Sequence, residues 1–126
     1  MILGIGTDVT SIERIRNSRV ELDKLALRIL TDYEFKEYQK QNSLPEKFLA
    51  KRWAAKEAIS KAWGTGISGD TKWKNIEVRH DQLGAPYICF YNKLKETQDT
   101  LNAKCHLSIS DEGDTVIAYS IIEYSR

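Results

Sequence analysis

Residues 48–66, FLAKRWAAKEAISKAWGTG, predict one helix of about five turns that leads directly into a short glycine loop. At roughly 100° per residue, Glu57 and Lys61 lie on one face, flanked only by alanines. A second, apolar stripe should pack on a core and consists of Phe48, Ala55, Ile59 and Ala62. A Glu–Lys pair at this spacing is commonly a solvated surface pair. A chemical role therefore requires a complementary group from another part of the chain.

The loop Gly64-Thr65-Gly66 has two interpretations. Glycine after the last turn of a helix is a common C-cap. The same residues can leave backbone N–H groups free to approach an anion closely. The preceding helix also carries a basic run, made of Lys47, Lys51, Arg52 and Lys56. Solvation explains such a run by default, but a phosphate-rich ligand would use both the run and the loop.

The N-terminal residues 2–9, ILGIGTDV, predict a strand with two different faces. One face is apolar and carries Leu3, Ile5 and Val9. The other carries Gly4 and Gly6 and then the carboxylate of Asp8. Glycines inside a strand often mark a close approach to its backbone. Asp8 either caps the following turn or belongs to a site, and the pattern alone does not separate the two.

Capping patterns predict three helix starts, at Thr10–Glu13, Thr31–Glu34 and Ser43–Glu46, the last with Pro45 in the first turn. The first of these helices exposes Arg14, Arg16 and Arg19, which are either solvated or a basic patch for an acidic partner. The remaining segments predict strands at 76–79, 86–91, 105–110 and 115–123, and a helix at 92–103 that begins with Asn92 as its cap.

Within the strand 105–110, alternation places His106 on the polar face, opposite Leu107 and Ile109. His106 is either an ordinary half-buried histidine or a residue that faces a ligand. The order of elements is a strand, several helices and then β-β-α-β-β, which predicts an α+β fold rather than a doubly wound α/β fold. The length of 126 residues predicts a single domain, 1–126.

The formal net charge of +1 gives no global field for nucleic acid or membrane binding, so neither partner is expected. Cys89 and Cys105 lie in apolar, strand-like runs, which favours free thiols over a disulfide. The sequence shows no leader and no long apolar run. We therefore expect a soluble cytoplasmic protein.

Three motifs occur in order along the chain: GIGTDVTSIERI at 4–15, RWAAKEAISKAWGTG at 52–66 and HLSIS at 106–110. Together they resemble the holo-[acyl-carrier-protein] synthase family, the small single-repeat class of 4′-phosphopantetheinyl transferases. The resemblance covers nearly the whole chain. Two positions depart from the family pattern, because Thr7 replaces an aliphatic residue and Trp53 replaces a phenylalanine.

The resemblance implies an antiparallel sheet packed with a long central helix, in a homotrimer whose active sites lie between subunits. It implies transfer of 4′-phosphopantetheine from coenzyme A to a serine of apo acyl carrier protein, in fatty acid biosynthesis. The products are holo acyl carrier protein and adenosine 3′,5′-bisphosphate, and the reaction requires Mg²⁺.

The resemblance also assigns residues. Asp8 and Glu57 hold the metal, which suits a hard cation that takes phosphate oxygens and keeps some waters. Lys61 meets the same phosphates, and Glu57 is our candidate for the general base, either directly or through a metal-bound water. The remaining assignments for coenzyme A are Arg52 and His106 at the nucleotide end, Gly64, Thr65 and Gly66 along the phosphates, and Pro86 near the adenine. Arg14 meets the acidic carrier protein, and Arg16 extends that patch.

Two other functions stay open. A broader-range phosphopantetheinyl transferase would be about two such repeats long, and 126 residues supply one. A coenzyme A or carrier-protein binding module without catalysis would lack Asp8, Glu57 or Lys61, and all three are present.

Overall fold

The computed structural model describes residues 1–18 and 20–125. Arg19, the third arginine of the expected basic patch, lies outside the described residues. The elements follow in the order β1 (Ile2–Ser11), α1 (Ile12–Arg16), α2 (Leu22–Ile29), α3 (Asp32–Gln39), α4 (Pro45–Ala62), η1 (Trp73–Asn75), β2 (Ile76–His80), β3 (Pro86–Phe90), α5 (Asn92–Leu101), β4 (Ala103–Glu112) and β5 (Thr115–Tyr124). This order confirms the α+β prediction.

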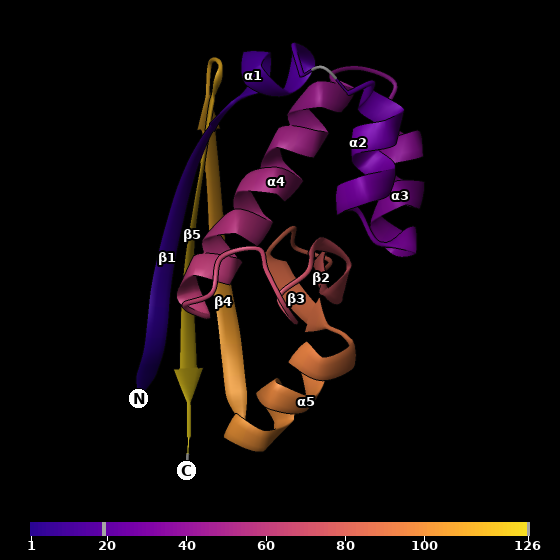
Figure 1. Ribbon diagram of the computed structural model, residues 1–126. Coiled ribbons are helices and arrows are strands. Elements are labelled where there is room, and N and C mark those ends of the chain that lie inside the picture. Colours follow the sequence, from indigo (N-terminus) through magenta and orange to yellow (C-terminus); the bar gives the residue numbers. More distant parts are fainter. Residues whose placement is uncertain (19, 126) are drawn as a thin grey trace.

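The main sheet has the strand order β1-β5-β4, and both pairings are antiparallel. The first and last strands of the chain are therefore neighbours, with Asp8 opposite Ala118 and Ile5 opposite Ile121. Both chain ends lie at the same end of this sheet (Figure 1), where the Met1 ammonium donates to the Tyr124 carbonyl at 2.9 Å. The pairing of β1 with β5 thus holds the two ends of the chain next to each other.

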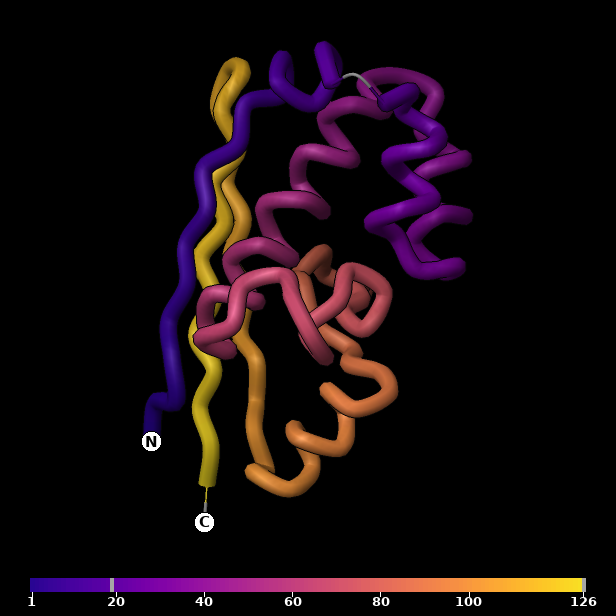
Figure 2. The backbone as a smooth tube through the Cα atoms, viewed as in Figure 1, coloured from indigo at the N-terminus to yellow at the C-terminus, as the bar shows by residue number. Residues whose placement is uncertain are grey.

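Helix α4 lies along one face of this sheet, and the other helices extend from the same side (Figures 1 and 2). Its sheet-facing side is built from fully buried alanines, among them Ala54, Ala58 and Ala62 at 0–2% exposure. Small side chains let a helix and a sheet approach closely. The outer face of the sheet remains apolar and exposed through Ile2, Leu3, Ile5, Val9, Ile117 and Tyr119.

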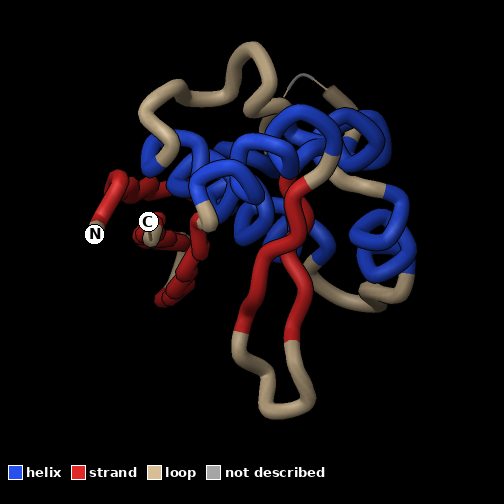
Figure 3. Tube along the Cα trace, turned by 90° about the horizontal axis from the view of Figure 1, so that it is seen from below, coloured by secondary structure: helices blue, strands red, loops and turns tan. Residues whose placement is uncertain are grey.

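The hairpin β2–β3 forms a separate two-stranded sheet that projects from the helices (Figure 3). A second core cluster joins this hairpin to α4 and α5 and contains Ile59, Ile76, Phe90 and Leu94. Trp63 packs edge-on against Phe90, with ring centroids 5.6 Å apart. The end of α4 is therefore held on the side away from the main sheet as well.

The predicted helix starts are partly correct. Thr31 and Glu34 form the expected capping box of α3. The α1 cap is Ser11 rather than Thr10, because β1 continues to Ser11 and its side chain accepts from the Arg14 N–H. The expected Ser43–Glu46 box is wrong, since Leu44 precedes Pro45 in a left-handed conformation with no side-chain cap.

Helix α5 likewise begins at Asn92 with Tyr91 as its N-cap, so the expected Asn92 cap is one residue late. Across residues 1–18 and 20–125, every helix is too short or too polar to cross a bilayer. Cys89 and Cys105 are free thiols, as expected.

Candidate active site

Two glycines of β1 bring this strand into direct contact with α4. A Cβ atom placed on Gly6 would lie 1.9 Å from the Ala58 carbonyl oxygen, and one on Gly4 would lie 2.0 Å from the Ala62 carbonyl oxygen. Both neighbours are backbone atoms, so no side-chain movement would make room. The predicted close approach to the glycine face is confirmed, and the approaching element is α4.

This contact places Asp8 beside Lys61. The Lys61 ammonium lies 3.4 Å from Asp8 Oδ1 and donates to the Thr7 carbonyl oxygen at 2.9 Å. Thr10 Oγ1 donates to the other Asp8 oxygen at 2.7 Å. The Thr7 side chain points elsewhere and donates to the Ala118 carbonyl, so this departure from the family pattern removes nothing from the site. Asp8 is therefore held on both sides, by the Lys61 ammonium at one carboxylate oxygen and the Thr10 hydroxyl at the other.

Glu57 faces the same region from α4. Burial raises the pKa of its carboxyl, and the Asp8 charge raises it further, whereas Lys61 and Arg14 act in the opposite direction. Four charged groups predicted from separate motifs are thus close enough to influence one another. Two carboxylates that repel each other in a half-buried position favour a cation between them.

The donor set determines which metal these residues suit. Among the residues that the structure describes, no cluster of three or more His, Cys, Asp or Glu side chains has the arrangement of a closed metal cage. Two oxygen-donor side chains without nitrogen or sulfur ligands match Mg²⁺, which commonly uses one or two carboxylates and completes its shell with water and substrate phosphate. Asp8 and Glu57 fit that ion.

The glycine loop after α4 differs from one expectation. The N–H groups of Thr65 and Gly66 both donate to the Ser60 carbonyl, at 3.2 and 3.1 Å, and Gly64 N–H donates to the Lys61 carbonyl at 2.9 Å. The expectation that these N–H groups are free for an anion is wrong, because they cap the carbonyl end of the helix. Gly64 and Gly66 adopt φ angles of +85° and +66°, as such a cap requires.

The basic run of α4 also differs from expectation, since its members have protein partners. Lys56 is fully buried, and its ammonium donates to Glu34 Oε1 and the Ile29 carbonyl, both at 2.6 Å. Burial lowers the pKa of Lys56, and Glu34 opposes that shift. Lys47 and Lys51 contact Asp111 at 3.0 and 3.1 Å. Lys56 is therefore a structural cation rather than a solvated one or a phosphate ligand.

Arg52 lies beside this buried pair and lines a pocket of about 530 Å³. Its Nε is 3.6 Å from Glu34 Oε2, and its guanidinium stacks over the Phe48 ring at 4.4 Å. Other members of the pocket include Lys51, His80, Pro86 and Ser108. Burial lowers the pKa of His80, and the charges of Arg52 and Lys51 lower it further. Glu37 on the same pocket acts in the opposite direction, so the pocket combines two cations with one carboxylate.

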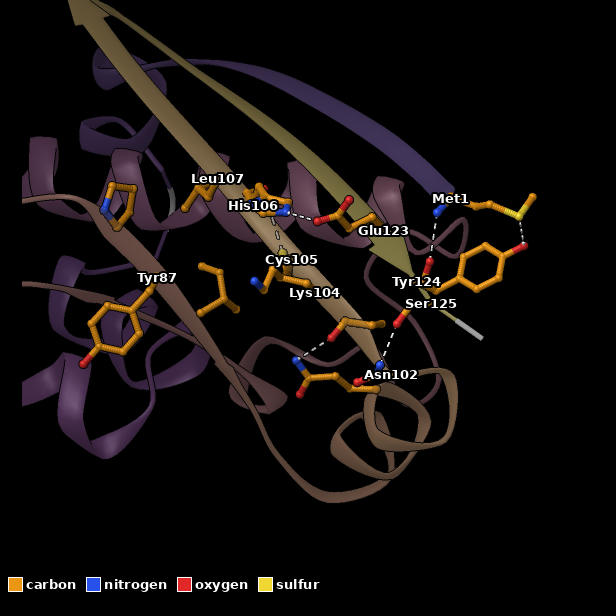
Figure 4. A pocket seen from close by; sticks show the side chains of 14 residues that line it. Met1, Tyr87, Asn102, Lys104, Cys105, His106, Leu107, Glu123, Tyr124 and Ser125 are labelled. Carbon is orange, nitrogen blue, oxygen red and sulfur yellow. Dashed lines mark hydrogen bonds and ion pairs between the residues drawn. The ribbon is translucent and has the colours of Figure 1, made fainter.

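His106 lines a second, larger pocket of about 850 Å³ (Figure 4). Its Nε2 lies 2.9 Å from Glu123 Oε1 on the neighbouring strand β5. Pro86 lines both pockets, so it marks the boundary between the Arg52 and His106 sides. Neither pocket contains Asp8, Glu57 or Lys61. Within one chain, the structure gathers the expected metal and phosphate groups in one place and the expected nucleotide groups in another.

Arg14 and Arg16 are exposed on α1, as predicted. Arg16 pairs with Glu46 of α4 at 3.3 Å. Sequence reasoning missed the partners that hold these elements: Glu34, Asp111, Asp114 and Glu123. One signal for Glu34 was available, because Arg52 and Lys56 occur within the apolar stripe of Ala55 and Ile59, and a charge on a buried face needs a partner.

A family model described as the 4′-phosphopantetheinyl transferase superfamily matches residues 4–119. The curated holo-[acyl-carrier-protein] synthase of Hamiltonella defensa is 46% identical over 124 residues, which cover 97% of this chain and 98% of that protein. The one from Dechloromonas aromatica is 41% identical over 126 residues, covering 99% of this chain and 100% of that protein.

Solved structures give the same result. The crystal structure of holo-[acyl-carrier-protein] synthase from Neisseria meningitidis is similar with a TM-score of 0.87 and 40% identity, covering 98% of this chain and 99% of that one. The enzyme from Bacillus anthracis in complex with coenzyme A (3′,5′-ADP) is similar with a TM-score of 0.83 and 37% identity, covering 99% of both chains.

Proposed function

The chain belongs to the 4′-phosphopantetheinyl transferase superfamily, and we propose that its single domain, 1–126, is a holo-[acyl-carrier-protein] synthase. It transfers 4′-phosphopantetheine from coenzyme A to a serine of apo acyl carrier protein. The serine oxygen forms a bond to the phosphorus that carries pantetheine, and the pyrophosphate bond to that phosphorus breaks. The products are holo acyl carrier protein, adenosine 3′,5′-bisphosphate and the serine proton.

One observation carries the proposal: β1 and α4 place Asp8, Glu57 and Lys61 together through a glycine contact that tolerates no side chain. A binding module without catalysis has no need for two carboxylates and an ammonium in one half-buried position. Cleavage of a pyrophosphate does need them, because negative charge develops on the leaving phosphate and must be neutralised.

Glu57 is our candidate for the group that takes the serine proton. Burial and the Asp8 charge raise the pKa of its carboxyl in the chain by itself. A cation bound to Glu57 would lower that pKa again, so Glu57 would take the proton either directly or through a water held by the metal. Lys61 offers a compact positive charge one helical turn away and stabilises the oxygen of the leaving phosphate. Asp8 orients Lys61 through the 3.4 Å contact.

Mg²⁺ is the cofactor we propose for Asp8 and Glu57, because a hard divalent cation with carboxylate ligands neutralises phosphate charge. The raised pKa of Glu57 supports this assignment, since a bound cation removes the repulsion between the two carboxylates.

The nucleotide end of coenzyme A is proposed to occupy the region around Pro86. Arg52 and Lys51 of this pocket suit a phosphate, and His106 contributes from the other side of Pro86. The relatives from Bacillus anthracis and Helicobacter pylori were solved in complex with coenzyme A, which supports this ligand. Gly64, Thr65 and Gly66 would border the phosphates through the open space above the glycines, because their N–H groups donate to helix carbonyls and the Thr65 hydroxyl donates to the Gly66 carbonyl at 2.8 Å.

A homotrimer is proposed because the two groups of site residues are separate within one chain. Sharing active sites between subunits would join Asp8 and Glu57 of one subunit to nucleotide-binding residues of the next. The exposed apolar outer face of the sheet, with Ile5 58% and Val9 63% exposed, supports such a contact. Sedimentation at assay concentration tests this point, and an active monomer would contradict it.

The carrier protein is proposed to dock on α1, whose exposed Arg14 and Arg16 attract an acidic partner. Arg14 also acts on the pKa of Glu57, so this docking surface adjoins the carboxylates. We place the reaction in fatty acid biosynthesis in the cytoplasm. The free thiols of Cys89 and Cys105 agree with a reducing compartment.

Intact-mass spectrometry of apo acyl carrier protein tests the reaction. Incubation with this protein, coenzyme A and Mg²⁺ should add the mass of one phosphopantetheine, and EDTA should prevent the gain. If several carrier proteins showed no gain, the chain would instead be a binding module, and Asp8 and Glu57 would be structural carboxylates.

A further inference from the structure

We propose that Asp114, in the turn between β4 and β5, is a positioning residue that fixes α1 and thereby determines how well the carrier protein docks. This inference rests on the proposed function. Asp114 lies outside the motifs of the sequence analysis, and it contacts neither Asp8 nor Lys61.

Helix α1 depends on outside support because it has only five residues, Ile12–Arg16. An isolated helix of that length is not stable in water. Asp114 supplies three hydrogen-bond acceptors at its start. The Asp114 carbonyl accepts from Ile12 N–H at 2.8 Å, Oδ1 accepts from Glu13 N–H at 2.8 Å, and Oδ2 accepts from the Ser11 hydroxyl. Two residues therefore cap α1: Ser11 accepts from the helix, and Asp114 orients the Ser11 hydroxyl.

The end of β4 next to this turn is attached to α4. Asp111 of β4 bridges Lys47 and Lys51, at 3.0 and 3.1 Å. Because Asp111 and Asp114 lie three residues apart, this end of the β4–β5 hairpin links the start of α1 to the first half of α4. In the described chain one ion pair joins α1 directly to α4, the contact of the half-exposed Arg16 with Glu46. Such exposed pairs contribute little.

The same cap reaches Arg14, the first arginine of the proposed docking surface. Ser11 Oγ accepts from the Arg14 backbone N–H at 3.2 Å, so Arg14 is one hydrogen bond away from the residue that Asp114 orients. Loss of Asp114 should destabilise α1 and leave the position of Arg14 less well defined. It should leave the Asp8–Lys61 contact and the Arg52 pocket intact, because neither includes the turn.

If Asp114 acted through its charge alone, its loss would change carrier-protein binding in the opposite direction to a loss of positioning. Removing the negative charge of Asp114 makes the α1 surface more positive, which should strengthen binding of an acidic carrier protein. Positioning predicts weaker binding. The sign of the change therefore separates the two explanations.

The experiment measures kcat and KM for apo acyl carrier protein and for coenzyme A in Asp114→Ala, Asp114→Asn and the control Glu112→Ala. Glu112 is exposed at the end of β4, two residues before Asp114, and makes no side-chain hydrogen bond or ion pair with the described residues. Asp114→Ala should raise KM for the carrier protein about fivefold, the factor that corresponds to loss of one helix N-cap. Coenzyme A KM should stay at the wild-type value, and kcat should change by less than the carrier-protein KM, because Arg14 has a smaller effect than Asp8 or Lys61 on the pKa of Glu57.

Asp114→Asn keeps an acceptor for Glu13 N–H and should restore part of the loss, while Glu112→Ala should match the wild type or bind slightly better. If Asp114→Ala does not fold, as judged by circular dichroism, Asp114→Asn and Ser11→Ala carry the test with the same expected direction. An unchanged or lower carrier-protein KM in the folded variants, with an active wild type, would overturn this inference alone. An inactive wild type would overturn the proposed function and this inference with it.

Discussion

The Asp8 carboxylate and the Lys61 ammonium lie 3.4 Å apart across the contact between β1 and α4, although 53 residues separate them in the sequence. The contact exists because Gly4 and Gly6 expose their backbone to the carbonyl oxygens of Ala62 and Ala58. Two positions without side chains on one face of β1 thus determine where the reactive groups lie.

Replacing Gly6 with alanine should damage both stability and activity. The new Cβ would lie 1.9 Å from the Ala58 carbonyl oxygen, so β1 must move away from α4. We expect a loss of about 1–3 kcal/mol in the free energy of unfolding, and more if the backbone cannot shift. Urea unfolding followed by tryptophan fluorescence measures the loss, and transfer to the carrier protein should fall with it.

Gly69→Ala is the matched control for this substitution. Gly69 has a φ of +55° but open space around its Cβ position, so the variant should lose about 1 kcal/mol and keep its activity. Equal loss of activity in both variants would show that the β1–α4 contact has no special role.

Replacing either of two lysines of α4 with methionine should affect different properties, stability for Lys56 and activity for Lys61. Lys56→Met leaves Glu34 buried without its main cation and should lower the free energy of unfolding by about 3–5 kcal/mol. Lys61→Met should leave stability nearly unchanged, because its side chain is 49% exposed, and should lower kcat by about 10²–10³. Chemical denaturation and steady-state kinetics on the same preparations distinguish the two roles.

The buried carboxylate of Glu77 should make stability depend on pH. Burial alone would raise its pKa, but hydrogen bonds from Thr31, Tyr91 and Arg79 outweigh that effect and lower it. A lowered pKa contributes stability that is fully present above the ordinary value of about 4.5 and is lost as the pH falls through the lowered pKa. Glu77→Gln should therefore be less stable than the wild type at pH 7.

The difference between Glu77→Gln and the wild type should narrow below pH 4.5. Urea titrations at several pH values measure it, with Glu96→Gln on the exposed face of α5 as the control. A difference that stays constant down to the acid transition would contradict the assignment.

Asp8→Asn should increase the Mg²⁺ concentration that the reaction requires. The substitution removes one of the two proposed carboxylate ligands and keeps the side-chain volume. The apparent affinity for Mg²⁺ should fall by more than the ~10–100-fold that loss of an outer-sphere partner costs. Activity measured across a Mg²⁺ titration tests this, and an unchanged half-saturation point would remove Asp8 from the metal site.

Much of this fold could be predicted from the sequence because local patterns and tertiary packing agree. The alternation in β4 correctly placed His106 opposite Leu107 and Ile109, and Pro45 correctly marked the start of α4. The capping box of α3 was found as well, because it depends on residues three apart. The glycine face of β1 predicted a close approach, and the small alanines of α4 explain why α4 is the approaching element.

The remaining features depend on contacts between distant residues. Lys56 looks like a surface lysine until α3 supplies Glu34 and η1 supplies the Trp73 carbonyl. The sequence suggested free N–H groups in the Gly64–Gly66 loop, but these groups donate hydrogen bonds to the carbonyls of Ser60 and Lys61. Asp114 carries no recognisable motif, and its role follows only from the turn that brings it to Ser11.

The most direct test of the central claim is intact-mass spectrometry of apo acyl carrier protein after incubation with coenzyme A, Mg²⁺ and either the wild type, Glu57→Gln or Glu96→Gln. The account predicts a phosphopantetheine mass gain with the wild type and with Glu96→Gln, and none with folded Glu57→Gln. A wild-type rate with Glu57→Gln would contradict the assignment of the active site to the contact between β1 and α4.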